Sequence, residues 1–127
     1  MTSSIKLFIS LFLLILIFPV YVNGEGYYQR GLASWYGRTH HGKKTASGGK
    51  FNIYDNTAAH RPLPFGSMLL VRNVENNKEV IVHVNDRGSF YSKRIIDLSF
   101  AAASALEITD EGLGVVEIDI LYKPKNK

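Results

Sequence analysis

The sequence predicts an all-β domain, a small closed barrel with one short helix, on three observations. Short runs rich in β-branched and aromatic residues recur along the chain, separated by clusters of Gly, Asn and Ser. One alanine-rich segment follows the next-to-last of these runs. About 100 of the 127 residues remain after an apolar N-terminal segment, enough for one domain. A closed barrel suits such short strands because it leaves no unpaired strand edge.

The first half of the domain predicts three strands and a long loop. Residues 31–36 alternate weakly and are bounded by glycine, which indicates a first strand. Residues 37–50 are dominated by Gly, Lys, His, Thr and Ser and predict a loop. The β-rich runs 68–74 and 78–84 flank the turn-forming segment 75–77, so together they predict a hairpin.

The second half predicts two strands around a helix. Residues 94–98 form a short apolar run that indicates a strand. Ser99 is suited to cap a helix over 100–106, where alanine and leucine favour helix. Residues 114–121 alternate between β-branched and polar or small side chains, which predicts the closing strand.

The N-terminal segment is typical of a secretory signal peptide. Lys6 precedes a nearly unbroken apolar run over 7–22, and small residues follow it. We therefore expect a signal peptide over 1–24 and a mature domain over 25–127. The alternative is a retained membrane anchor, although the run is shorter than the roughly 20 residues that a bilayer core requires. The chain has no cysteine, so it can form neither a disulfide nor a lipoprotein anchor.

Charge and histidine spacing exclude two classes of function. The net charge of +4 is a mild excess, not the dense basic stripe of a nucleic-acid binder. His40 and His41 are adjacent, with no further histidine at ligand spacing and no cysteine in the chain. We expect no metal, no cofactor and no nucleic-acid partner.

Asp86 is the best candidate for a reactive carboxyl group. It follows the strand-like run 80–84 directly and precedes Gly88, which permits a bend. In an extended strand Asp86 shares a face with the apolar Val82 and Val84, at the rim of the barrel interior. A carboxyl group there suits general acid catalysis. The alternative is that Asp86 only caps the following turn.

Five motifs in order give the chain a family resemblance over residues 31–121. They are Ala33-Ser34-Trp35-Tyr36-Gly37, His41-Gly42-Lys43-Lys44-Thr45-Ala46-Ser47-Gly48, Thr57-Ala58-Ala59-His60-Arg61-Pro62-Leu63-Pro64-Phe65-Gly66, Val84-Asn85-Asp86-Arg87-Gly88-Ser89-Phe90 and Arg94-Ile95-Ile96-Asp97-Leu98-Ser99. With these motifs the chain resembles the RlpA family of septal-ring lytic transglycosylases. The resemblance implies a six-stranded double-psi β-barrel, and we expect a short form without the C-terminal repeat domain of many members.

The resemblance also implies an activity. It is endolytic cleavage of peptidoglycan glycan strands that lack stem peptides, leaving 1,6-anhydromuramyl ends. Asp86 matches the catalytic aspartate of the family and His60 its histidine. A single carboxyl group suffices for such a lyase, because the 6-hydroxyl of the sugar attacks and no water is activated, whereas hydrolases usually need two. The chain departs from the family where Gly49 and Lys50 replace a common glutamate, for which Asp55 is a candidate substitute.

Further residues are expected around the glycan. Aromatic rings can stack on sugars, and short polar side chains and one cation can bind hydroxyl, acetamido and carboxylate groups. The expected substrate-binding residues are Trp35, Tyr36, His41, Thr45, Ser47, Asn85, Arg87 and Phe90. Asp97 is expected to support the barrel or to cap the helix, and Arg87 is an alternative partner for it.

The expected partner is peptidoglycan, in the periplasm or cell wall of a bacterium. We expect a monomer without a membrane span after cleavage of the leader, with division-septum proteins as possible partners. The alternative function is a non-catalytic, expansin-like module that binds glycans or loosens the wall. Gly49 in place of the usual glutamate favours this alternative.

Overall fold

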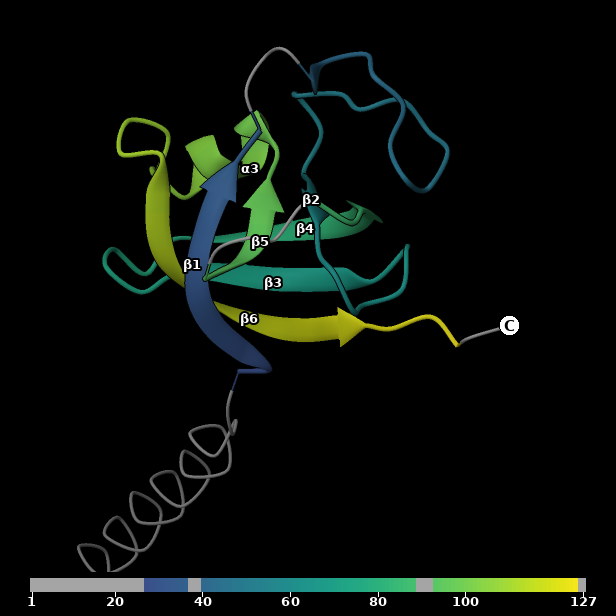
Figure 1. The fold of residues 1–127 in the computed structure, drawn as a ribbon. Helices are drawn as coiled ribbons and strands as arrows, with labels where there is room; N and C mark the ends of the chain where they lie inside the picture. Colours follow the sequence, from purple (N-terminus) through teal and green to yellow (C-terminus); the bar gives the residue numbers. More distant parts are fainter. Residues whose placement is uncertain (1–26, 37–39, 89–92, 126–127) are drawn as a thin grey trace, which may run out of the picture.

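The computed structural model describes residues 27–36, 40–88 and 93–125, and they fold into a closed six-stranded barrel (Figure 1). Around the barrel the strands follow the order β1-β5-β2-β4-β3-β6. The expected signal peptide over 1–24 lies outside the described residues. The elements are β1 (Gln29–Trp35), β2 (Thr57–Ala59), β3 (Met68–Asn73), β4 (Glu79–Asp86), β5 (Arg94–Leu98), α3 (Phe100–Ala105) and β6 (Leu113–Tyr122).

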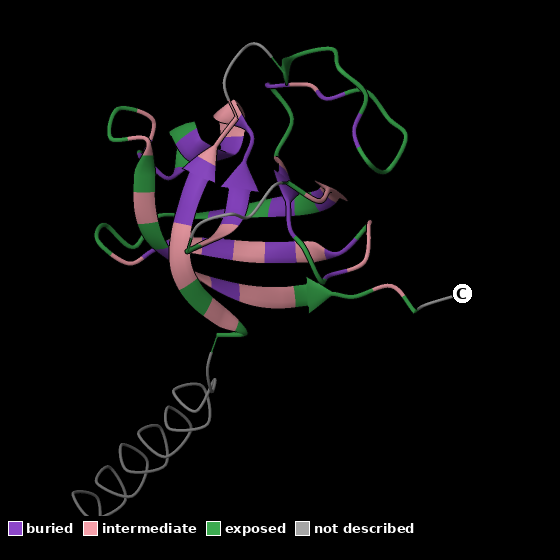
Figure 2. Cartoon of the chain, viewed as in Figure 1, coloured by how far each residue is buried: buried purple, intermediate pink, exposed green. Residues whose placement is uncertain are grey.

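Alternating side chains fill the barrel. In β3 and β4 every second residue is buried, because successive side chains in a strand point to opposite faces (Figure 2). Leu69 and Val82 lie opposite each other in this pair and are both fully buried. Ile118 of β6 and Ile96 of β5 are also fully buried and belong to the same apolar cluster. The core is therefore aliphatic, and polar side chains collect at the ends of the barrel and on its outer face.

Two parallel pairings decide where a site can form. β1 pairs in parallel with β5, and β2 pairs in parallel with β4, whereas β2 and β5 are antiparallel neighbours. In the register Trp35 lies opposite Leu98, and Ala59 lies opposite both Asp86 and Asp97. The last residues of β1 and β4 and the polar end of β5 thus meet on one side of the barrel.

The helix is capped as the sequence predicts. The Oγ of Ser99 accepts a hydrogen bond from the backbone N–H of Ala102 (3.2 Å), which satisfies one of the free donors of the first turn. The buried Ala102 and Ala103 press the helix onto the barrel. The N–H of Ala101 also donates to the carbonyl of Ile53 (2.9 Å), which ties the long loop before β2 to the helix.

The predicted all-β class and the β3–β4 hairpin are confirmed, with differences at the boundaries. β1 begins at Gln29 and β4 continues to Asp86, two residues beyond each prediction. β2 has only three residues, and the sequence pattern did not reveal it. Within the described part of the chain, no helix has the length and apolar character needed to cross a membrane.

Candidate functional site

Asp86 ends β4, and three donors orient its carboxylate. The backbone N–H of Arg87 (2.8 Å) and that of Ala46 (3.2 Å) both donate to Oδ1. The hydroxyl of Tyr36 donates to Oδ2 at 3.3 Å. Gly88, two residues on, has a φ of 68°, a conformation that glycine adopts without strain. Asp86 therefore stabilises the turn after β4 and, being only partly buried, also presents its carboxylate to the surface.

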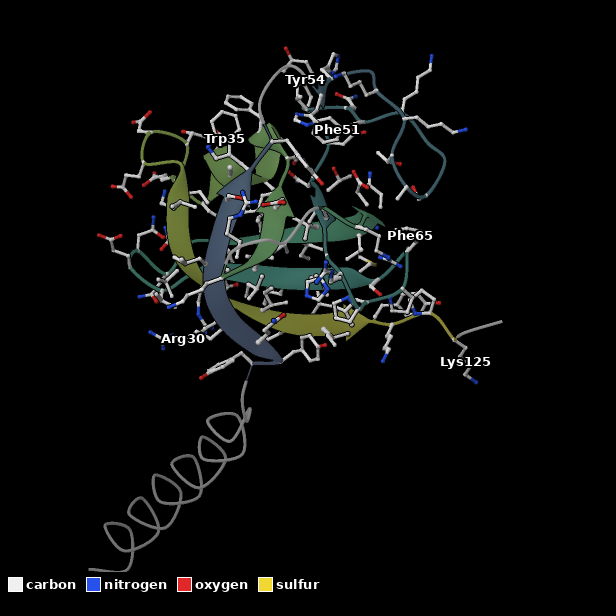
Figure 3. All side chains as sticks on the ribbon, viewed as in Figure 1. Arg30, Trp35, Phe51, Tyr54, Phe65 and Lys125 are labelled. Atoms are coloured by element: carbon white, nitrogen blue, oxygen red, sulfur yellow. The ribbon has the colours of Figure 1, made fainter. Side chains whose placement is uncertain are left out.

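A cleft of about 480 Å³ lies beside this carboxylate. It is formed where β1, β4 and β5 present their polar ends, and Figure 3 shows Trp35 and Phe51 toward this upper part of the barrel, with Arg30 at the opposite end. The cleft is open and mainly polar, which suits a hydroxyl-rich ligand better than an apolar one. Its lining residues are Trp35, Tyr36, His40, Asp86, Arg87, Gly88, Arg94 and Asp97.

The loop over residues 40–56 forms one wall of the site. The N–H of Ser47 donates to the carbonyl of Asn85 (3.2 Å), so the loop is fixed to the end of β4. Thr45 is buried, and its hydroxyl lies 2.9 Å from that of Ser47. A second, small cavity of about 30 Å³ lies between this loop and Asp86 and shares Tyr36 and His40 with the cleft.

Tyr36 lines the cleft and donates its hydroxyl hydrogen bond to Asp86. Its ring packs edge-on against Phe51 (5.0 Å between centroids) and lies 5.3 Å from the ring of His40. Burial, followed by the negative charges of Asp86 and then Asp97, raises the pKa of the Tyr36 phenol far above its usual value. The phenol therefore stays protonated and donates to Asp86. The predicted role of Tyr36 in sugar binding stays a prediction, since the half-buried residue also lines the cleft.

The imidazole of His60 is fully buried and turns away from the cleft. Its Nδ1 accepts from the N–H of Leu63 (3.4 Å), so Nε2 carries the proton and donates to Oε1 of Gln29 (2.9 Å). His60 reaches Asp86 through the main chain, where its N–H donates to the Asp86 carbonyl at 3.0 Å. Burial, and then the positive charge of Arg87, lowers the pKa of His60 to about 4.

This histidine makes the stability of the fold depend on pH. The unfolded chain protonates His60 at its usual value of 6.5, whereas the folded protein resists protonation down to about 4. The contribution of His60 is thus complete above pH 6.5 and is lost as the pH falls toward 4. It is worth about 3 kcal/mol in the free energy of unfolding. Urea unfolding at a series of pH values is expected to show this decline.

Two histidine variants isolate the contribution of His60 to this pH dependence. His60→Gln keeps hydrogen-bonding groups but cannot titrate, so its stability should stay nearly flat between pH 6.5 and 5. His83 lies exposed on β4, and His83→Gln should keep the wild-type slope. Equal slopes in all three proteins would contradict the assignment to His60.

The guanidinium of Arg87 is engaged by main-chain carbonyls and an aromatic ring of the protein. Its Nη1 donates to the carbonyls of His60 (3.1 Å) and Leu63 (2.8 Å). The guanidinium also lies over the ring of Phe65, 3.7 Å from its centroid. The alternative pairing of Arg87 with Asp97 is not formed, because Arg94 lies 3.5 Å from the Asp97 carboxylate instead. Arg87 borders the cleft while it holds the segment after β2 in place.

Of the other predicted substrate-binding residues, some line the cleft and some do not. Trp35 lines the cleft and packs against Phe100, with 5.6 Å between ring centroids. The Nδ1 of His41 accepts from the N–H of Ile53, and its ring faces Tyr54 rather than the cleft. Asn85 has a buried side-chain Oδ1 that receives no hydrogen bond from the described residues. Phe90 lies outside the described residues.

Two cleft residues escaped the sequence analysis. His40 lines both cavities, although the adjacent His41 was the residue chosen. Arg94 lines the cleft and pairs with Asp97, although residues three apart in a regular strand point to opposite faces, so the sequence held no signal for this pair. Within the described ranges, no three His, Asp or Glu side chains gather as a metal site would require.

The fold and the cleft at its end define a double-psi β-barrel, and comparisons with solved structures agree. The Streptomyces papain inhibitor superposes with a TM-score of 0.58 at 22% identity, over 73% of this chain and 96% of its own. A mutant of Clavibacter michiganensis expansin, solved with cellohexaose, gives a TM-score of 0.59 at 17% identity, over 77% of this chain and 52% of its own. At these identities the likeness concerns the fold alone.

Sequence comparison then gives the family. Residues 28–120 match the family model described as lytic transglycolase. The chain is 48% identical over 102 residues to the endolytic peptidoglycan transglycosylase RlpA of Haemophilus influenzae, covering 80% of this chain and 36% of that protein. The Pseudomonas aeruginosa protein of the same name is also 48% identical, over 76% of this chain and 28% of that protein. This chain belongs to the RlpA-like lytic transglycosylase family, and it spans about a third of the length of these relatives.

Proposed function

We propose that the protein is an endolytic lytic transglycosylase that cleaves peptidoglycan glycan strands, those without stem peptides by preference. The observation that carries the proposal is the Asp86 carboxylate, oriented by three donors at the edge of an open polar cleft. The relatives at 48% identity are named for this activity. The products are strands that end in 1,6-anhydromuramyl residues.

Asp86 is both acid and base in the proposed reaction. Its carboxyl proton passes to the glycosidic oxygen as the bond from that oxygen to the anomeric carbon breaks. The anomeric carbon becomes positively charged, and the 6-hydroxyl of the same sugar attacks it. The hydroxyl proton returns to the Asp86 carboxylate as the new carbon–oxygen bond closes. No water is consumed, so the reaction is a lyase reaction.

The surrounding residues position this carboxylate and the strand. The Tyr36 hydroxyl and the Ala46 N–H fix its two oxygens in different directions. His60 acts through its main-chain hydrogen bond, which aligns β2 with the end of β4, and not through direct contact with the sugar. Trp35 and Arg94 face the cleft and supply an apolar face and a cation for the glycan.

A second candidate function is a non-catalytic module that binds glycans. Two points favour it: Gly49 stands where the family resemblance implies a glutamate, and an expansin shares the fold. Binding without bond cleavage would need the cleft but not the proton of Asp86.

Product analysis tests the proposal. Purified glycan strands without stem peptides are incubated with the full chain, and the soluble products are examined by mass spectrometry. Products 18 mass units lighter than hydrolytic ones, with anhydro ends, are expected. Reducing ends would indicate a hydrolase and overturn the lyase assignment. Binding without any soluble product would instead support the glycan-binding module.

Restoring the family glutamate is expected to raise the cleavage rate without harming the fold. A Cβ atom built at Gly49 meets nothing within 4 Å, and the φ of this residue is not left-handed. The Gly49 carbonyl accepts from Thr45, beside the small cavity that Asp86 borders. Gly49→Glu should therefore keep the melting temperature and add a negative charge near the reacting sugar. Initial rates and thermal melting on both proteins are compared. A melting point more than a few degrees lower would show that the loop does not accept the side chain.

The chain is further proposed to be exported, with residues 1–24 as leader and 25–127 as one mature domain that acts as a monomer in the periplasm or wall. Division-septum proteins are the proposed partners. N-terminal sequencing of the protein recovered from the periplasm should give a start near Glu25. Recovery only from membranes, with Met1 retained, would support an anchor.

A further inference from the structure

Asp97 is the second carboxylate of the cleft. Ala59 of β2 lies opposite Asp86 on one side and opposite Asp97 on the other. The two acids therefore stand level on the strands that flank β2. Neighbouring strands are roughly 4.8 Å apart, so the two Cα atoms are about 10 Å apart. Both side chains line the same cleft, which leaves the space between them open to a ligand.

Two neighbouring side chains hold the Asp97 carboxylate in place. The Ser34 hydroxyl donates to its Oδ1, and the Arg94 guanidinium lies 3.5 Å from the same oxygen. Arg94 also donates to the Ser34 hydroxyl at 3.0 Å, so the three side chains form one connected group. This arrangement fixes the carboxylate through Oδ1 and compensates the cost of burying its charge.

Of the two roles that the sequence suggested for Asp97, Ser99 fills the helix cap, whereas the bond from Ser34 on β1 does tie Asp97 into the barrel wall. The Asp97 side chain is only 8% exposed, yet it borders the cleft, and its charge helps to raise the pKa of the Tyr36 phenol beside Asp86. Its electric field therefore acts at the centre of the site.

We propose that Asp97 is the carboxylate that stabilises the positive charge developing on the reacting sugar while Asp86 transfers the proton. This inference rests on the proposed function and deepens it. A negative charge that is fixed and oriented before the reaction lowers the energy barrier to forming positive charge on the sugar. It does so because no solvent has to reorganise as that charge forms. Asp97 forms no bond to the sugar and keeps its charge throughout the reaction. It supplies, from the barrel wall, negative charge that the loop lacks at Gly49.

Asp97→Asn tests this role with a matched control. The amide keeps the size of the side chain and an oxygen for Ser34 but removes the charge, so kcat should fall on the order of 10²-fold with KM changed little. Ser34→Ala removes the hydrogen bond to the same oxygen and keeps the charge. It should lower the melting temperature but cost only a few-fold in kcat. If both variants lose activity in proportion to their melting temperatures, Asp97 is only structural and the proposal fails.

A binding measurement tests the charge independently of turnover. The probes are two N-acetylglucosamine oligomers, one ending in a cationic iminosugar ring and the other in a neutral sugar. The wild-type protein should bind the cationic probe at least 10-fold more tightly, and Asp97→Asn should lose this preference while Ser34→Ala keeps it. An unchanged preference in Asp97→Asn overturns the inference even if the wild type releases anhydro products. If the wild type releases none, the proposed function fails, whereas the probe ratio still decides whether Asp97 acts on a positive charge.

Discussion

Asp86→Asn is expected to reduce the release of anhydro-ended products by about 10²- to 10⁴-fold, the usual contribution of general acid catalysis. The amide has the size of the carboxyl group, and its oxygen can still accept from the N–H groups of Arg87 and Ala46. It cannot deliver a proton at neutral pH. The melting temperature and the affinity for glycan strands should therefore change little while the rate falls.

The control for this variant is Asp119→Asn. Asp119 lies on β6, opposite Leu70, and does not border the cleft. Asp119→Asn should therefore cleave glycan strands at the wild-type rate. If Asp86 serves only as a turn cap, Asp86→Asn should instead lose about 1 kcal/mol of stability and cleavage should follow stability. A folded Asp86→Asn protein that cleaves at the wild-type rate would remove Asp86 from the mechanism.

Arg87→Met is expected to lower the free energy of unfolding by about 3 kcal/mol, since two carbonyls lose a charged donor. The methionine side chain fills similar space over Phe65 but cannot donate to His60 or Leu63. For a domain of about 100 residues this loss corresponds to a decrease in melting temperature of more than 10 °C. Calorimetry or circular dichroism on the purified variant measures it.

Arg30→Met provides the comparison for Arg87. Arg30 is half exposed and forms its ion pair with Glu117 at 3.2 Å on the outer face of the barrel. Exposed pairs of this kind contribute roughly 0–1 kcal/mol, so the melting temperature should fall by only a few degrees. Equal decreases in the two variants would show that Arg87 does not hold the segment after β2.

The strands that could be predicted are those long enough to show a period. β3, β4 and β6 alternate over six residues or more, and the turn between β3 and β4 contains asparagine, so the hairpin was visible in the sequence. β2 has three residues, two of them alanine, and its position is decided by pairing with β4 and β5 rather than by its own composition. The sixth strand came only from the family resemblance.

The candidate site was predictable where a reactive side chain stands at the end of a strand. Asp86 stands at the end of an alternating apolar run, so its place at the barrel rim followed from parity. The partners of Tyr36 and Arg87 did not, because Asp86, Phe51 and the His60 carbonyl are distant from them in sequence. Alternation along a strand shows which face of the sheet a side chain lies on. Its contact partners on that face become known only when the barrel is closed.

The pairing of β1 with β6 has a consequence for how the molecule folds. Gln29 lies opposite Ile118, so the first and last strands of the domain are joined directly. Loop-closure entropy makes such distant pairings slow to form, and proteins that depend on them fold in milliseconds to seconds rather than microseconds. A ribosome must therefore release almost the whole domain before the barrel can close. Until then β6 is missing from between β3 and β1, and the barrel that carries the cleft is incomplete.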